Sequence, residues 1–251
     1  MSNELAVILA AGRGNRMKSD LPKVLFPVLG RPMIHWVLDA IQRAGIRQSV
    51  IVVGYRAELV RAELAGRHGI QFALQEQQLG TGHAVQMCRG VIAQHSGAVL
   101  VVAGDSPLIQ PSSIERLLGE FYGGQYACLL GTLIKDIPTG LGRIVRSEQG
   151  EFARIVEEKD ASAAEKDIRE VNMSTYLFQS EDLSLALDKL GNANAQGEYY
   201  LTDCPALLRH MGKKVDARPV LAACEALSIN TIEELGAVES KMLQMGYQCV
   251  N

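Results

Sequence analysis

Residues 5 to 17 read LAVILAAGRGNRM, an apolar run that leads directly into a glycine-rich turn. Apolar runs of this kind are typical of strands that are buried on both faces of a parallel sheet. A glycine-rich turn after such a strand lets backbone N–H groups approach a phosphate with no side chain in the way. The stretch therefore predicts an α/β fold with a ligand site at the end of its first strand.

The turn departs from two common phosphate-binding patterns. The dinucleotide-binding pattern has a third glycine where this chain has Met17, and a P-loop has glycine before its lysine, where Met17 again stands before Lys18. The turn instead carries four cations within eleven residues, namely Arg13, Arg16, Lys18 and Lys23. Arginine can grip a phosphate with two hydrogen bonds, and lysine supplies a point charge. We predict a polyphosphate cradle; the alternative is a surface turn with scattered charges.

Strands and helices alternate through the rest of the first half. Further apolar strands are predicted at Ser49–Val53, Ile70–Leu74 and Ala98–Ala103, and helices with one apolar face at 34–41, 59–64 and 85–91. This order predicts a Rossmann-like, mixed but mostly parallel sheet with helices on both faces. Ligands of such sheets bind where the carboxyl ends of the strands meet the loops.

The second half is less regular and predicts a small β-rich lobe. A hairpin is predicted from 142–145 and 152–156, followed by a polar helix at 161–169, a strand at 171–178, and helices at 181–190, 199–211 and 231–245. No low-complexity linker or internal repeat separates these segments. We predict a single domain over residues 1–251, made of two halves, about 1–135 and about 136–230, and a C-terminal helix at 231–251.

Composition excludes several classes of protein. The net charge of -3 lacks the basic surplus of nucleic-acid-binding proteins. Five cysteines with no C-x-x-C spacing argue against a disulfide framework or a zinc knuckle, and fit a reducing compartment. No apolar run approaches the roughly 18 residues of a membrane span, and no basic segment precedes the N-terminal run as in a signal peptide. We expect a cytoplasmic protein with no nucleic-acid or membrane partner.

Ordered motifs identify a family resemblance. The glycine-rich turn and Leu21–Leu25 resemble the signature of sugar-1-phosphate nucleotidyltransferases. Five later segments are similar to the uridyltransferase (pyrophosphorylase) domain of bacterial N-acetylglucosamine-1-phosphate uridyltransferases: Gln75–Ala84, Gly104–Leu108, Pro138–Ile144, Ile155–Asp160 and Asn194–Asp203. The likeness runs from about Leu5 to Asn230 and makes the two halves a nucleotide-binding and a sugar-binding half.

The resemblance implies an activity. UTP and N-acetylglucosamine 1-phosphate would condense to UDP-N-acetylglucosamine and pyrophosphate, with Mg²⁺ as cofactor. One alternative is a uridylyl- or thymidylyltransferase for another hexose 1-phosphate. Another is a non-catalytic nucleotide-sugar-binding protein of the same fold, which would not need to keep metal ligands. The oligomeric state is open.

The resemblance also implies site residues. The catalytic residues would be Arg16 and Lys23. The nucleotide would contact Leu9, Ala10, Ala11, Gly12, Gly14, Lys23, Gln75, Gly80, Thr81 and Asp105. The sugar would contact Gly104, Gly142, Glu157 and Asn172, and the metal ion Asp105 and Asn230. A glutamine amide presents a donor beside an acceptor, which suits the edge of a pyrimidine, and Mg²⁺ prefers one or two carboxylates plus substrate phosphates.

Each of these roles has a plainer alternative. Asp105 could cap a helix, and Asn230 could be the N-cap of the last predicted helix with Glu233 at its third position. Gln75 could belong to an ordinary polar loop, and Glu157 could be a solvated carboxylate. His83 follows the predicted base-binding loop, and we expect it to be structural.

Three features depart from the family. Asn172 is followed by Met173-Ser174, where relatives usually have a small residue and then glycine. Ala103 stands where relatives often have a larger residue. These positions leave the identity of the sugar open. Longer relatives also carry an acetyltransferase domain of hexapeptide repeats, and no such repeat precedes Asn251, so we expect no acetyltransferase activity.

Overall fold

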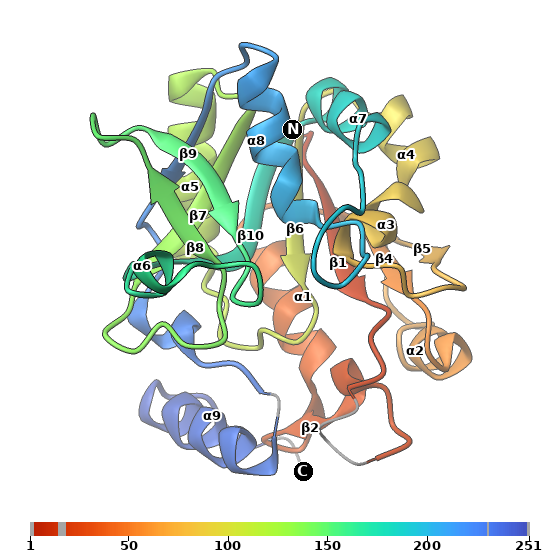
Figure 1. Ribbon diagram of the computed structural model, residues 1–251. Helices are drawn as coiled ribbons and strands as arrows, with labels where there is room; N and C mark the ends of the chain where they lie inside the picture. The colour runs from red at the N-terminus through yellow and green to blue at the C-terminus, as the bar shows by residue number, and fades with distance from the viewer. Residues whose placement is uncertain (1–2, 15–18, 230, 250–251) are drawn as a thin grey trace.

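The computed structural model describes residues 3–14, 19–229 and 231–249 (Figure 1). Within these residues, one mixed sheet runs in the order β11-β7-β10-β6-β1-β4-β5, and β8 and β9 extend from β10. Its strands are β1 (Leu5–Ala10), β4 (Gln48–Val53), β5 (Ile70–Leu74), β6 (Ala98–Ala103), β7 (Cys128–Ile134), β8 (Arg143–Arg146), β9 (Phe152–Val156), β10 (Glu170–Gln179) and β11 (Val215–Arg218). A separate hairpin is formed by β2 (Pro27–Val28) and β3 (Arg31–Pro32).

Helices cover both faces of the sheet, as the alternating pattern predicts (Figure 1). One face packs against α1 (Met33–Arg43), α2 (Ala57–Glu63) and α5 (Pro111–Gly124). The other packs against α3 (Thr81–Gln86), α4 (Arg89–Gln94), α7 (Ser180–Asp188) and α8 (Cys204–His210). The remaining helices are α6 (Ala163–Lys166), α9 (Ile232–Gln244) and the 3₁₀ turns Lys23–Leu25, Leu201–Asp203 and Ala223–Ala226. None of the helices in the described part of the chain is both long and apolar enough to span a bilayer.

The central strand shows why the fold forms. Ala6 and Ile8 of β1 enter one core, and Leu5 and Val7 enter the other, so the strand is apolar throughout. β1 pairs in parallel with both β4 and β6. Because Leu9 lies opposite Ala103 in this register, the turn after β1 and the loop after β6 meet at one edge of the sheet.

Several predicted elements differ from the observed ones. The helix predicted at 85–91 is two short helices, α3 and α4, because Cys88 N bonds to the carbonyl of Val85 and turns the chain between them. The helix predicted at 161–169 is only the short α6. The helix predicted from 199 begins as a 3₁₀ turn, and the α-helix starts at Cys204, where Pro205 suits the first helical turn. Strands β7 and β11 and helix α5 were not predicted from the sequence.

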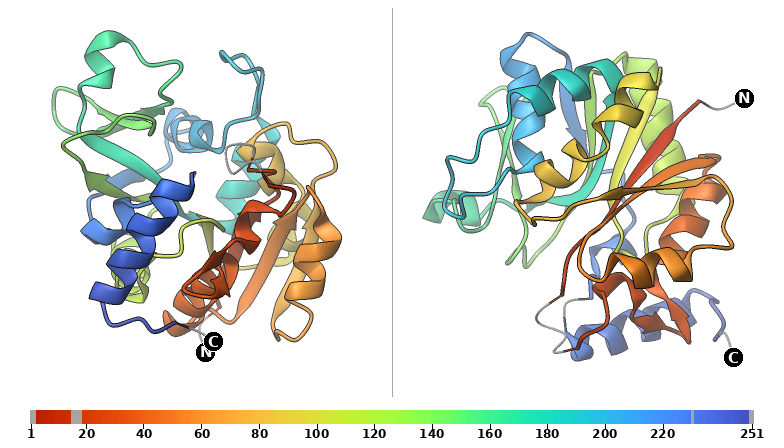
Figure 2. Two further views of the ribbon diagram at one scale, coloured as in Figure 1. Left: turned by 90° about the horizontal axis from the view of Figure 1, so that it is seen from below. Right: turned by 90° about the vertical axis from the view of Figure 1, so that its right-hand side faces the viewer.

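Helix α9 packs beside the β2–β3 hairpin at one end of the molecule (Figures 1 and 2). Val238 and Met242 of α9 are fully buried in a small core there, and Leu29 N donates to Glu239 Oε1 at 2.8 Å. Thr231 is the N-cap of α9, and it forms a capping box with Glu234. The alternative N-cap considered from the sequence, Asn230, lies outside the described residues.

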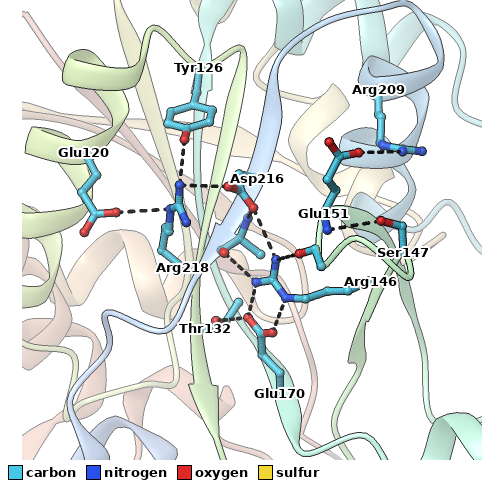
Figure 3. Close-up of polar contacts among 12 residues, drawn as sticks. Glu120, Tyr126, Thr132, Arg146, Ser147, Glu151, Glu170, Arg209, Asp216 and Arg218 are labelled. Carbon is cyan, nitrogen blue, oxygen red and sulfur yellow. Dashed lines mark hydrogen bonds and ion pairs between the residues drawn. The ribbon is translucent and has the colours of Figure 1, made fainter.

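The small lobe is held to the edge of the main sheet by charged side chains (Figure 3). Arg146 of β8 donates two hydrogen bonds to the carboxylate of Glu170, at 2.7 and 2.8 Å, and another to the carbonyl of Ala217 at 2.7 Å. Asp216 of β11 lies between Arg146 and Arg218 and pairs with both. One arginine thus ties β8 to β10 and β11.

Candidate active site

A cavity of about 300 Å³ opens at the carboxyl ends of β1 and β6. The predicted nucleotide residues that line it are Leu9, Ala10, Ala11, Gly12, Lys23, Gln75, Gly80, Thr81 and Asp105. Other residues lining it that the sequence reading did not single out for the nucleotide are Val24, Gln78, Ala84, Ala103, Ser174 and Glu198. The fold thus gathers residues from six separate segments around one space of ligand size.

Two glycines after β1 have different surroundings. A Cβ atom at Gly12 would meet nothing within 4 Å, so the backbone there is open to the cavity. Gly14 has φ +69°, and a Cβ there would lie 2.8 Å from the Cβ of Lys23. Gly14 therefore acts by letting Lys23 approach the turn, and it is not among the residues lining the cavity.

Lys23 and Asp105 form an ion pair on the cavity wall, with Nζ 2.5 Å from Oδ2. Asp105 caps no helix, because α5 begins at Pro111 with Gln110 as its N-cap. Its carboxylate is 29% exposed and is one hard oxygen ligand of the kind that Mg²⁺ takes. Within the described ranges no three His, Cys, Asp or Glu residues form a metal cage, so substrate phosphates would have to supply further ligands. The carboxylate fits such an open site. Arg16 and Asn230 lie outside the described residues.

Gln75, another residue that lines the cavity, is held in a fixed orientation. The side chain is 3% exposed, and Nε2 donates to the carbonyl of Gly80 at 3.0 Å and lies 3.1 Å from Nδ1 of His83. Gly80 has φ +110°, and a Cβ there would come within 2.5 Å of the Tyr199 carbonyl. His83, expected to be structural, thus contacts the side chain predicted to recognise the base. Gln75 and His83 are eight residues apart in the sequence, and this spacing alone does not predict a contact between their side chains.

The predicted sugar residues Gly142, Glu157 and Asn172 lie together. Asn172 N donates to the carbonyl of Gly142 at 2.8 Å, and a Cβ at Gly142 would lie 3.5 Å from Glu157 Oε2. Thr202, which the sequence reading missed, donates to Glu157 Oε1 at 3.0 Å. We call Gly142, Glu157 and Asn172 the acceptor cluster. The fourth predicted sugar residue, Gly104, is packed against the β1 backbone, with its N–H bonded to the Leu9 carbonyl at 2.9 Å.

A second cavity of about 450 Å³ adjoins the first. Asn172 of the acceptor cluster and Leu141 line it on one side, and Lys135 and the start of α9 line it on another. Ala103, Asp105 and Ser174 line both cavities. The two spaces therefore share a wall at the end of β6, and Asp105 stands on that wall. Ligands in the two cavities would meet beside the carboxylate.

Comparison with known proteins shows the family to which the chain belongs. Residues 6–140 match the model of the MobA-like NTP transferase domain. The chain belongs to this family. The match covers β1, the glycine-rich turn, Gln75 and Asp105, so most residues lining the first cavity lie in the matched part of the chain, and Ser174 and Glu198 lie beyond it.

Individual relatives of this NTP transferase domain align with nearly the full length of the chain. It is 46% identical over 237 residues to the bifunctional protein GlmU of Exiguobacterium sp., covering 94% of this chain and 52% of that protein. It is 45% identical over 242 residues to GlmU of Streptococcus suis, covering 96% and 52%. The chain thus spans about half the length of these curated relatives. The crystal structure of a UDP-glucose pyrophosphorylase complexed with UDP-glucose shares the fold, with a TM-score of 0.78 at 15% identity over 97% of this chain and all of that one.

Gln75→Ala is expected to reduce the selectivity of this NTP transferase domain for the base of its nucleotide substrate. Gly80 and His83 take up the two N–H groups of the buried amide, so Oε1 is the group that can accept a hydrogen bond from a base. A mismatched base would leave this acceptor unpaired, and such sites discriminate strongly. We expect the ratio of kcat/KM for UTP over other nucleoside triphosphates to fall at least tenfold. Competition assays with mixed triphosphates measure this ratio. Gln71→Ala, on the exposed part of β5, is the matched control, and an unchanged ratio in Gln75→Ala would contradict the role.

We expect binding of the sugar 1-phosphate to weaken as the pH falls. This weakening should begin at a higher pH than it would for a carboxylate with an ordinary pKa. Burial raises the pKa of Glu157, the charges of Asp160 and Asp203 raise it further, and the hydrogen bond from Thr202 lowers it only in part. As pH falls through this raised pKa, the carboxylate takes up a proton and loses capacity to accept hydrogen bonds from a sugar. KM for the sugar 1-phosphate should rise accordingly. In Glu157→Gln, the part of the pH dependence of KM that is due to Glu157 should disappear, and only the titration of the substrate phosphate should remain. An identical pH profile of KM in both proteins would refute the role of Glu157 in binding the sugar.

Proposed function

We propose that this chain transfers a uridylyl group from UTP to N-acetylglucosamine 1-phosphate, giving UDP-N-acetylglucosamine and pyrophosphate. The observation that carries the proposal is the shared wall of the two cavities. Gln75 lines the first cavity, Asn172 of the acceptor cluster lines the second, and Asp105, paired with Lys23, lines both. Residues 1–135 would serve the nucleotide, and residues 136–230 the sugar.

The reaction needs no strong general base. An oxygen of the sugar phosphate attacks the α-phosphorus of UTP, and the bond from that phosphorus to the oxygen bridging to the β-phosphate breaks. The second pKa of a phosphate monoester is about 6, so the attacking oxygen is already largely anionic at neutral pH. The difficulty is to bring several negative charges together. Positioning and neutralisation of charge therefore account for most of the catalysis.

The chain supplies this neutralisation from the glycine-rich side of the cavity. Lys23 places an ammonium group beside Asp105, and Gly12 and its neighbours leave backbone open to the phosphates. Arg16, which the sequence places in the same turn, would add a second cation for the leaving pyrophosphate. Asp105, with Asn230 as the expected second ligand, would hold Mg²⁺, which when bound supplies positive charge shared between the phosphates of both substrates.

A pyrophosphate-release assay tests the proposal. Purified protein, Mg²⁺ and each of UTP, dTTP and ATP would be combined with the 1-phosphates of N-acetylglucosamine, glucose and N-acetylgalactosamine. We expect UTP with N-acetylglucosamine 1-phosphate to give the highest kcat/KM. A clear preference for dTTP or another hexose phosphate would support the alternative transferases. Tight UTP binding by calorimetry with no pyrophosphate release from any pair would indicate a non-catalytic nucleotide-binding protein.

A further inference from the structure

Strand β10 contains a two-residue bulge beside the site. Asn172 lies opposite Thr132 of β7, but Thr175 lies opposite Gly131, the very next residue of the partner strand. Met173 and Ser174 are therefore extra residues with no partner in this ladder. In a regular strand successive side chains point to opposite faces, yet Asn172, Met173 and Ser174 all line the second cavity. The bulge therefore brings three consecutive residues to the wall of one space.

Ser174 holds an unfavourable backbone conformation. Its φ is +52°, in the left-handed region that residues with a Cβ atom rarely occupy and that glycine adopts easily. Its N–H donates to Oδ1 of Asn172 at 3.2 Å, which fixes the turn of the bulge. Strained positions of this kind concentrate at functional sites, where the side chain gives something in return.

The Ser174 side chain is placed to contact a ligand. Together with Ala103 and Asp105 it lines both cavities. Across the described ranges, no hydrogen bond joins its hydroxyl to another protein group, whereas its N–H is bonded. A hydroxyl can donate to an anionic phosphate oxygen and form a strong, charge-assisted hydrogen bond.

We propose that Ser174 contacts substrate in this chain, its hydroxyl donating a hydrogen bond to the phosphate of the sugar 1-phosphate where the two cavities meet. The proposal rests on the proposed function, because it assigns the ligand of the shared wall. The residue types support it: the family that the sequence resembles usually has glycine here, which would hold this backbone without strain. Serine at this position retains the strain and adds a donor.

Two substitutions separate this role from a structural one. Ser174→Gly removes both the hydroxyl and the Cβ that is strained at positive φ, whereas Ser174→Ala removes only the hydroxyl. We expect both variants to lower kcat/KM for N-acetylglucosamine 1-phosphate at least tenfold, with KM for UTP within about twofold of the wild type. The melting temperature should rise by about 1 to 3 °C in Ser174→Gly and not in Ser174→Ala. In Ser174→Gly, kcat/KM would then fall while the melting temperature rises.

The matched control is Gln125→Gly. Gln125 has φ +54° at the exposed C-cap of α5, and it should gain stability with unchanged kinetics. Near-wild-type kcat/KM in Ser174→Gly would overturn the proposal, as would equal losses of activity and melting temperature in both Ser174 variants. If the wild-type protein releases no pyrophosphate with any substrate pair, the proposed function itself fails. An active wild type with an equally active Ser174→Gly contradicts only the role of Ser174.

Discussion

Asp105→Ala is expected to reduce turnover by about 10²–10³-fold or more at saturating concentrations of both substrates, the usual effect of losing one charge-stabilising contact. The carboxylate stands on the wall shared by both cavities and pairs with Lys23 at 2.5 Å. Its loss removes the expected metal ligand and leaves the lysine without this partner. Single-turnover pyrophosphate release would measure the effect on the chemical step directly.

Two further variants show whether the loss of turnover in Asp105→Ala comes from unfolding or from a general change in charge. Asp105→Asn keeps the shape of the side chain and removes its charge, so it should lose nearly as much activity while melting close to the wild type. Asp136→Asn, which alters an exposed carboxylate paired with Arg169, should leave turnover unchanged. A shift to higher Mg²⁺ requirement in Asp105→Asn would support metal binding. Near-wild-type rates in both Asp105 variants would refute the catalytic role of this carboxylate.

Arg143→Met is expected to lower the free energy of unfolding by about 3 kcal/mol or more. The side chain is almost completely buried, and Nη2 lies 2.7 Å from Glu158 Oε2. The guanidinium also donates to the carbonyls of Leu141 and Lys166. Removing it leaves a carboxylate and two carbonyls without their donor, which costs more than the net strength of the pair.

Arg143→Met is also expected to weaken acceptor binding. Leu141 precedes Gly142, Glu158 follows Glu157, and Arg143 itself pairs in the sheet with Val171, the neighbour of Asn172. Chemical denaturation and the two KM values would test both effects, with Arg146→Met as the control. Arg146 is paired equally well but is more exposed and lies in the separate network of Figure 3, so its loss should cost less stability and leave KM for the sugar unchanged. Equal effects of the two substitutions would refute a special role for Arg143.

The parts of the fold that were predictable are those determined by local pattern. The bounds of β6 were predicted to the residue, and β1 was predicted at the apolar run that begins with Leu5, because both strands are buried on both faces and are unbroken apolar runs. β7 is equally apolar apart from Gly131 and Thr132, and its place in the sheet depends on pairing with β10, which the sequence pattern does not show. The antiparallel direction of β10 likewise follows from long-range pairing.

The candidate site divides in the same way. The nucleotide residues follow recognisable motifs at strand ends, and most of them line one cavity. Thr202 lies 45 residues from the carboxylate it bonds, and the segment that contains His83 gave no sign that its ring contacts Gln75. The strain at Ser174 depends on a bulge that exists only once β10 pairs with β7. Contacts that depend on the folded arrangement could not be read from spacing.

The pairing of β10 with β6 has a consequence for how proteins of this kind can diversify. Thr175 lies opposite Val102, so the tip of the bulge stands directly beside the end of β6. Insertion, deletion or exchange of the two bulge residues would change the shape of the second cavity while the strands beside the proposed nucleotide site stay in register. Homologues could therefore drift toward new acceptors through one short irregular segment and inherit their nucleotide chemistry intact.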